Sequence, residues 1–96
     1  MVSLLELFFR QIKFSGKTDY QGEILWDSKP PVRQKKVVCS INADTNAITF
    51  KRLKASFDMQ ESFVSTVGNE WQVKIPLTDE EKGDGFFVMR TKRLYI

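Results

Sequence analysis

The residues with the clearest binding chemistry are cations that gather in the middle of the chain. Residues 29–57 carry seven lysines and arginines against one acidic residue, whereas residues 58–85 carry seven acidic residues against two cations. The formal net charge is only +3. The chain is therefore weakly charged as a whole, but its positive and negative residues lie in separate segments of the sequence. Clusters of lysine and arginine attract phosphates and other anions. The candidate binding residues are Arg33, Lys35, Lys36, Lys51, Arg52 and Lys54, with Arg90, Lys92 and Arg93 near the C-terminus.

Two interpretations of these cations compete. In the first, they grip the phosphates of a nucleic acid, and Trp26 or Phe50, if exposed, stacks on bases with a gain of about 1–3 kcal/mol per base. In the second, they form a solvated face, and the acidic residues of 58–85 fold against it in cross-strand ion pairs worth about 0.2–1 kcal/mol each. The second interpretation is favoured, because the neighbouring acids are numerous enough to neutralise the cations.

Catalytic chemistry has little support in the composition. The chain has no histidine and a single cysteine, Cys39, so Ser-His and Cys-His relays are excluded and the commonest metal ligand is missing. Cys39 shares an apolar face with Val37 and Ile41 and is expected to be a buried, inert thiol. The acidic run 79–84 does not match a calcium-loop pattern. We therefore expect a protein that is not an enzyme, with no catalytic residue, metal site or cofactor.

The single cysteine also bears on the compartment. Small secreted domains are commonly stapled by disulfides, so one cysteine without a partner indicates a reducing compartment such as the cytoplasm. The apolar stretch 4–9 contains Glu6, follows no Lys or Arg and precedes no small-residue cleavage site, so it does not match a signal peptide. A membrane-spanning helix needs about 20 apolar residues, and we expect no membrane association.

An amphipathic segment opens the chain, and helix and strand compete for it. Ser3 and Glu6 match a capping box, the apolar residues of 4–12 share one helical face, and Gly16 would end such a helix. The alternative is a strand over residues 7–14, which are rich in aromatic and β-branched types. The helix is preferred, and any part of its apolar face that the sheet leaves uncovered could bind a second copy or a partner.

Beyond Gly16 the apolar residues alternate with polar ones, which is typical of half-buried strands. We expect strands at 23–26, 36–41, 47–53, 57–67, 71–77 and 86–90, the last extending in one version through 94–96. Thr78 and the acids after it match the start of a one-turn helix. Pro31 and Pro76 are expected at strand ends or edges, because proline lacks the N–H that a ladder needs.

Two turns connect these strands into hairpins. Residues 42–46 are rich in Asn and Asp, which favour tight turns, and residues 67–70 contain Gly and Asn. If strands 36–41 and 47–53 pair across the first turn, Lys36 and Arg52 lie nearly opposite each other. The hairpin 33–54 would then concentrate positive charge at its open end.

The elements together predict a single domain over residues 1–96 that is mainly β. We expect a small antiparallel sheet of five to six strands curled toward a barrel or sandwich, with one N-terminal helix in the preferred version and α+β as the alternative class. The function that fits best is a non-enzymatic binding module that engages another protein or a second copy, as an adaptor, inhibitor or assembly subunit. The alternative is a nucleic-acid-binding protein that uses the basic hairpin 33–54 and the basic C-terminal strand.

Overall fold

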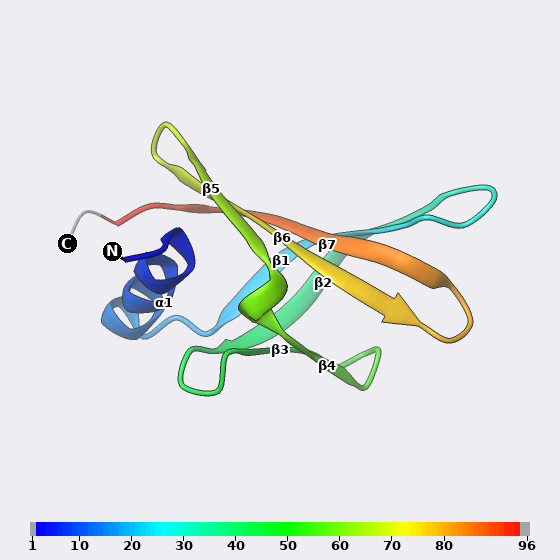
Figure 1. The fold of residues 1–96 in the computed structure, drawn as a ribbon, viewed down its shortest axis with the longest axis horizontal. Coiled ribbons are helices and arrows are strands. Elements are labelled where there is room, and N and C mark those ends of the chain that lie inside the picture. Colours follow the sequence, from blue (N-terminus) through cyan, green and yellow to red (C-terminus); the bar gives the residue numbers. More distant parts are fainter. Residues whose placement is uncertain (1, 95–96) are drawn as a thin grey trace.

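Residues 2–94 are described by a computed structural model, in which seven antiparallel strands form one sheet that curls into a half-barrel (Figure 1). The strand order across the sheet is β4-β3-β2-β1-β7-β6-β5. The mainly β class is confirmed, and the sheet is slightly larger than expected. The elements in chain order are α1 (Leu4–Ser15), β1 (Asp19–Trp26), β2 (Val32–Asn42), β3 (Ala47–Phe50), β4 (Ala55–Asp58), the 3-10 helix η1 (Met59–Glu61), β5 (Phe63–Val67), β6 (Glu70–Asp79) and β7 (Gly83–Lys92).

The N-terminal segment is a helix, so the alternative strand over 7–14 is wrong. The Ser3 Oγ accepts a hydrogen bond from the Glu6 N–H at 3.1 Å, as the capping box predicts. Gly16 ends the helix in a left-handed conformation with φ of 70°, which a residue without Cβ adopts at no steric cost. The helix buries Phe8 and Ile12 in the core that the sheet encloses.

Gln11 fastens this helix to the end of the sheet. Its side chain is only 4% exposed, and its Nε2 donates to the Lys92 carbonyl oxygen at 2.9 Å. Its Oε1 accepts from the Trp71 indole N–H and from the Leu94 N–H. A buried amide is stable only when such partners satisfy it. The sequence reasoning missed this residue, although a lone Gln within an apolar helical stripe was a visible signal.

The core occupies the inner face of the curled sheet. Residues 71, 73, 75 and 77 of β6 alternate inward as predicted and are all buried. Phe50 and Phe87 meet edge to face with ring centroids 5.0 Å apart. Gly85 allows β7 to approach β1 closely, because a Cβ there would lie 2.6 Å from the Leu25 carbonyl oxygen.

The two edge strands β4 and β5 follow each other in the chain although they lie at opposite ends of the strand order. The predicted single strand over 57–67 is therefore wrong. The Asp58 Oδ1 accepts from the Gln60 N–H at 2.8 Å and starts η1, which interrupts the extended backbone. Met59 of η1 is fully buried, and its N–H donates to the Asn46 carbonyl oxygen at 2.7 Å. The sheet thus curls until η1 links its two edges.

The turns confirm some predictions and correct others. The turn at 42–46 is confirmed, with the Asn42 Oδ1 accepting from the Asp44 N–H at 2.9 Å. The one-turn helix after Thr78 is wrong, because β6 continues to Asp79 and pairs with β7 there. The Asp79 carboxylate instead accepts from the N–H groups of residues 81 and 82 and closes a hairpin.

The strand ends bear on three further predictions. Pro31 directly precedes β2, and Pro76 lies in β6 beyond Lys74, the last residue that β5 pairs, so both prolines occupy end or edge positions as expected. The extension of the last strand fails at Leu94, because β7 ends at Lys92. Residues 95–96 lie outside the described part of the chain.

Candidate functional site

The candidate site begins where β3 leaves β2. The two strands pair only through Ser40 with Thr49, Ile41 with Ile48 and Asn42 with Ala47, whereas β2 pairs with β1 over most of its length. The predicted strand 47–53 therefore ends early, at Phe50, and residues 51–54 form a turn into β4. The expected pairing of Lys36 with Arg52 is wrong for the same reason. The side of β2 that faces away from β1 has no strand beside residues 32–39 within the described part of the chain.

Val38 is the residue whose backbone faces this open side. The Ile41 N–H donates to the Thr18 carbonyl oxygen at 2.8 Å, so Ile41 directs its backbone groups toward the β1 side. Successive residues of an antiparallel strand direct these groups to alternate sides, so Val38 directs its N–H and C=O away from β1. Its side chain is also 58% exposed. We call residues 32–39 on this side the free edge of β2.

A bulge interrupts β2 in the middle of the free edge. Gly22 pairs with Val37 but Ile24 pairs with Gln34, so β2 contains one extra residue at this point. Lys36 within the bulge has φ of 58°, a left-handed conformation that costs a non-glycine residue about 1–2 kcal/mol. Bulges of this kind redirect side chains and are frequent beside binding sites. The sequence shows no signal for it, because no glycine marks the position.

A hollow of about 840 Å³ lies between the free edge of β2 and the turn 51–54. It occupies the place that a longer β3 would have filled. Val37 and Leu53 are half-buried in its wall, and Cys39 and Phe50 are buried beneath it. We call this hollow the basic groove; its lining residues are Asp19, Gln34, Lys35, Lys36, Val37, Val38, Cys39, Ser40, Thr49, Phe50, Lys51, Arg52 and Leu53.

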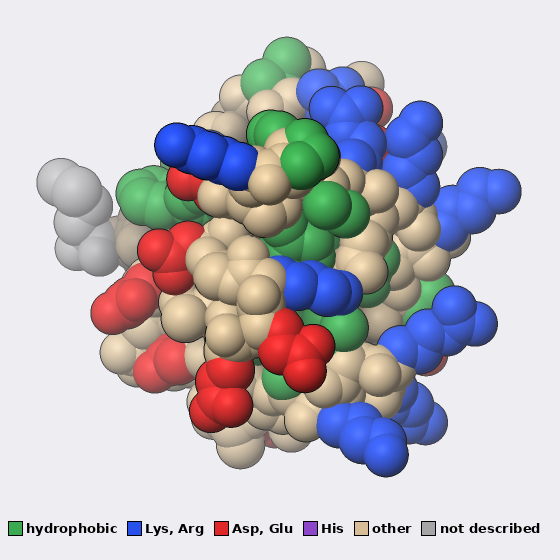
Figure 2. Space-filling view, turned by 90° about the vertical axis from the view of Figure 1, so that its right-hand side faces the viewer, with side chains coloured by type: hydrophobic (Ala, Val, Ile, Leu, Met, Phe, Trp, Pro, Cys, Tyr) green, Lys and Arg blue, Asp and Glu red, His purple; other side chains and the backbone are tan. Residues whose placement is uncertain are grey.

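The cations of the groove are not neutralised by the acidic segment. The ion pairs within residues 2–94 join Lys13 to Asp44 at 2.8 Å and Arg33 to Glu23 at 3.3 Å, and none of them involves a residue of 58–85. The ion pairs that the second interpretation expects with those acids are therefore not formed within residues 2–94, whereas the groove cations are solvent-exposed, as it also expects. Figure 2 shows most of the basic side chains along one side of this end of the molecule and most of the acidic side chains along the other.

The nine predicted binding residues separate into three groups. Lys35, Lys36, Lys51 and Arg52 line the basic groove together. Arg33 and Lys54 are exposed near it in the sequence but do not line it. The C-terminal cations lie elsewhere: Arg90 and Lys92 are exposed on β7, and the Arg93 guanidinium lies 5.0 Å from the Trp71 ring centroid, beside the helix.

The groove offers neither an aromatic platform nor a reactive thiol. Trp26 is 2% exposed, with its Nε1 donating to the Gln34 Oε1 at 3.0 Å, and Phe50 is fully buried. Burial raises the pKa of the Cys39 thiol to about 12, so the thiol stays neutral at ordinary pH and is a poor nucleophile. Groups of three or more potential metal ligands are also not found among the described residues.

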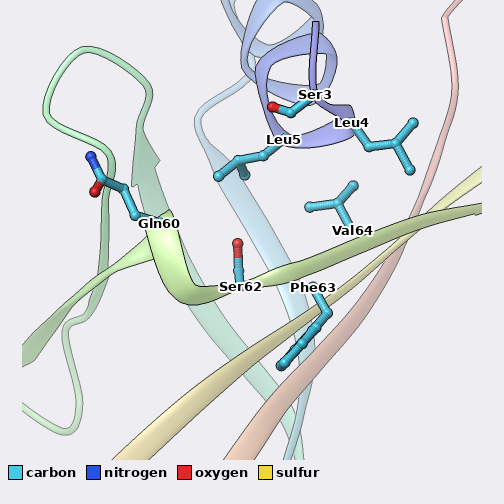
Figure 3. A pocket seen from close by; sticks show the side chains of 7 residues that line it. All are labelled: Ser3, Leu4, Leu5, Gln60, Ser62, Phe63 and Val64. Carbon is cyan, nitrogen blue, oxygen red and sulfur yellow. The ribbon is translucent and has the colours of Figure 1, made fainter. Parts of the chain in front are cut away.

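A second, apolar hollow of about 440 Å³ lies between the start of α1 and the edge strand β5 (Figure 3). Leu4 and Leu5 of the helix and Val64 of β5 line it, together with Gln60, Ser62 and Ser3. Phe63 also borders it, but its side chain points away from the helix and is 64% exposed. Leu4, Leu7 and Phe14 are exposed as well, so the sheet leaves part of the apolar helical stripe uncovered.

The chain matches no family model, no curated protein and no solved structure. Among the described residues, no helix has the length and apolar character needed to cross a membrane.

Proposed function

We propose that this protein is a non-enzymatic binding module that takes an acidic, extended segment of another protein into the basic groove. The segment adds as a strand to the free edge of β2. The observation that carries this proposal is the position of the free edge: it borders a hollow lined by Lys35, Lys36, Lys51 and Arg52. Main-chain hydrogen bonds supply affinity in this mode, and the flanking side chains supply specificity.

Two features favour a peptide over a nucleic acid as the ligand. Grooves for single-stranded nucleic acid combine cations with aromatic side chains on which bases stack, and here Trp26 and Phe50 are buried. A strand edge also presents alternating N–H and C=O groups, which match a peptide backbone, whereas phosphate oxygens only accept hydrogen bonds. Nucleic-acid binding by the hairpin 33–54 and the C-terminal cations is the second candidate, supported by the absence of ion pairs between the groove cations and acidic residues within residues 2–94.

The thiol supports the rest of the proposal. A nucleophilic cysteine needs a lowered pKa, and the pKa of Cys39 is raised instead. Cys39 is also free and buried, which fits a reducing compartment such as the cytoplasm.

A titration with a short peptide of alternating Glu and Val tests the proposal, with backbone amide NMR shifts as the readout. We expect the largest shifts at Val38 and its neighbours on the free edge. The double variant K51E/R52E should weaken binding by about tenfold or more, because it reverses half of the groove cations. The matched control R90E/K92E changes the net charge equally on β7 and should bind within about twofold of the native chain.

Two outcomes would overturn the proposal. One is equal weakening in both double variants, which would mean that only net charge matters. The other is the absence of peptide binding at low salt. If oligonucleotides bind instead, with log K falling against log salt by about 0.7–0.9 per phosphate, the nucleic-acid candidate replaces the proposal.

A further inference from the structure

An acidic turn lies at the same end of the molecule as the basic groove. The turn between β6 and β7 carries Glu80 and Glu81, both exposed. Neither carboxylate belongs to an ion pair within residues 2–94. Lys82, the cation of this turn, is half-buried and places its Nζ 5.5 Å from the Trp26 ring centroid. It is therefore directed at the protein, and the turn presents negative charge to solvent.

The conformation of this turn is fixed by its own hydrogen bonds. The Asp79 carboxylate accepts from the N–H groups of Glu81 and Lys82, at 3.2 and 2.9 Å. The Thr78 hydroxyl donates to the Asp84 Oδ1 at 3.1 Å. These contacts fix the backbone of the turn, so Glu80 and Glu81 extend into solvent from a rigid support.

The two charged regions are arranged so that this end of the molecule complements itself. In Figure 2 most of the basic side chains follow one side of the face and most of the acidic side chains the other. Consider a two-fold axis that lies in the plane of this face, along the line between its basic and acidic halves. Rotation about this axis places the basic half of one copy on the acidic half of the other. The same contact then forms twice, and the assembly closes at two copies.

We propose that two copies of this chain associate through this end, with the basic groove of each copy facing the acidic turn of the other. Lys51 and Arg52 supply exposed cations, and Glu80 and Glu81 supply exposed anions. The association uses side-chain charges and does not need strand addition at the free edge of β2, so it can hold or fail independently of the proposed function. A partner segment that enters the groove competes with it.

Sedimentation equilibrium of the full chain tests this proposal. We expect dimers at about 0.01 M salt, where charges interact over about 30 Å. We expect monomers at about 1 M salt, where screening shortens this range to about 3 Å. The variant K51E/R52E cancels the positive charge of the groove, because Lys35 and Lys36 remain beside two new carboxylates, and E80K/E81K makes the turn basic. Each variant alone should therefore be monomeric at low salt. Their equimolar mixture should form a heterodimer, because the carboxylates introduced at positions 51 and 52 face the lysines introduced at positions 80 and 81, and the unchanged groove faces the unchanged turn.

The mixture also guards against misfolded variants, because only folded chains restore the complex. R90E/K92E is the matched control and should dimerise like the native chain. A native chain that stays monomeric at low salt, or a mixture that stays monomeric, would refute the proposal. Dimers that persist at high salt would refute it as well and would locate the interface at an apolar surface, such as the exposed side chains around β5.

Discussion

Replacing Val38 with proline tests the free edge of β2 directly. Proline has no N–H and cannot donate to an added strand. The lost hydrogen bond contributes about 0.5–1.5 kcal/mol net, and the pyrrolidine ring also obstructs the approaching backbone. We therefore expect the dissociation constant for the acidic peptide to rise by about tenfold, which corresponds to about 1.4 kcal/mol. The free energy of unfolding should change by less than about 1 kcal/mol, because Val38 is exposed and its N–H faces away from β1.

Proline at Val37 is the matched control, one residue away. Val37 pairs with Gly22 and packs against the core, so its N–H faces β1 by the same alternation. It also follows Lys36, whose φ of 58° conflicts with the extended backbone that a following proline requires. We expect Val37→Pro to lower the free energy of unfolding by about 3 kcal/mol or more.

Urea unfolding followed by tryptophan fluorescence measures both stabilities, and the peptide titration measures binding. If Val38→Pro destabilises the protein as much as Val37→Pro, the N–H of Val38 is bonded within the fold and the edge is not free. If Val38→Pro leaves the protein stable but binds the peptide as tightly as the native chain, strand addition is the wrong mode of binding.

Two further predictions concern buried polar groups. Gln11→Leu should lower the free energy of unfolding by about 2–4 kcal/mol, because it leaves the buried Trp71 N–H without an acceptor and removes the bonds to Lys92 and Leu94. Urea unfolding measures this change. A change below about 0.5 kcal/mol would show that the Gln11 amide does not fasten the helix to the sheet. Burial in the folded protein raises the pKa of Cys39 from 9.0 to about 12. Between these two pH values the thiol is ionised in the unfolded chain but protonated in the folded one. The free energy of unfolding therefore falls as the pH rises, by at most about 1.4 kcal/mol per pH unit. Comparison of the pH profiles of the native chain and Cys39→Ala, which lacks this titration, isolates the effect, and identical slopes above pH 9 would refute it.

Local patterns in the sequence predicted the elements whose signals are local. The helix α1 was identifiable because Ser3 and Gly16 mark its ends, and β6 because its inward residues alternate without interruption. The turn 42–46 was identifiable because Asn42 bonds to its own backbone neighbours. In each case the deciding interaction lies within a few residues of its signal.

The boundaries that were missed depend on long-range pairing. Alternation of apolar residues continues through 47–53 and 57–67, but an alternating pattern does not specify where the partner strand ends. The turn after Phe50 contains no Gly, Pro or Asn, and Lys54 takes φ of 51° there instead. The bulge at Lys36 likewise lacks a glycine. Turns and bulges built from lysines leave no compositional signal, because these residues adopt positive φ only when the surrounding structure imposes it.

Four of the nine predicted binding residues, Lys35, Lys36, Lys51 and Arg52, lie together, but through a geometry that differs from the predicted one. Side by side in a ladder, Lys36 and Arg52 would repel each other across a filled sheet and form only a charged stripe. Because β3 ends at Phe50, the groove cations of residues 35–36 and 51–52 instead lie on two sides of an open space bordered by unpaired backbone. A stripe attracts any anion, whereas a gap with an unpaired strand edge also selects for an extended backbone. The proposed specificity for a peptide therefore depends on the early end of β3.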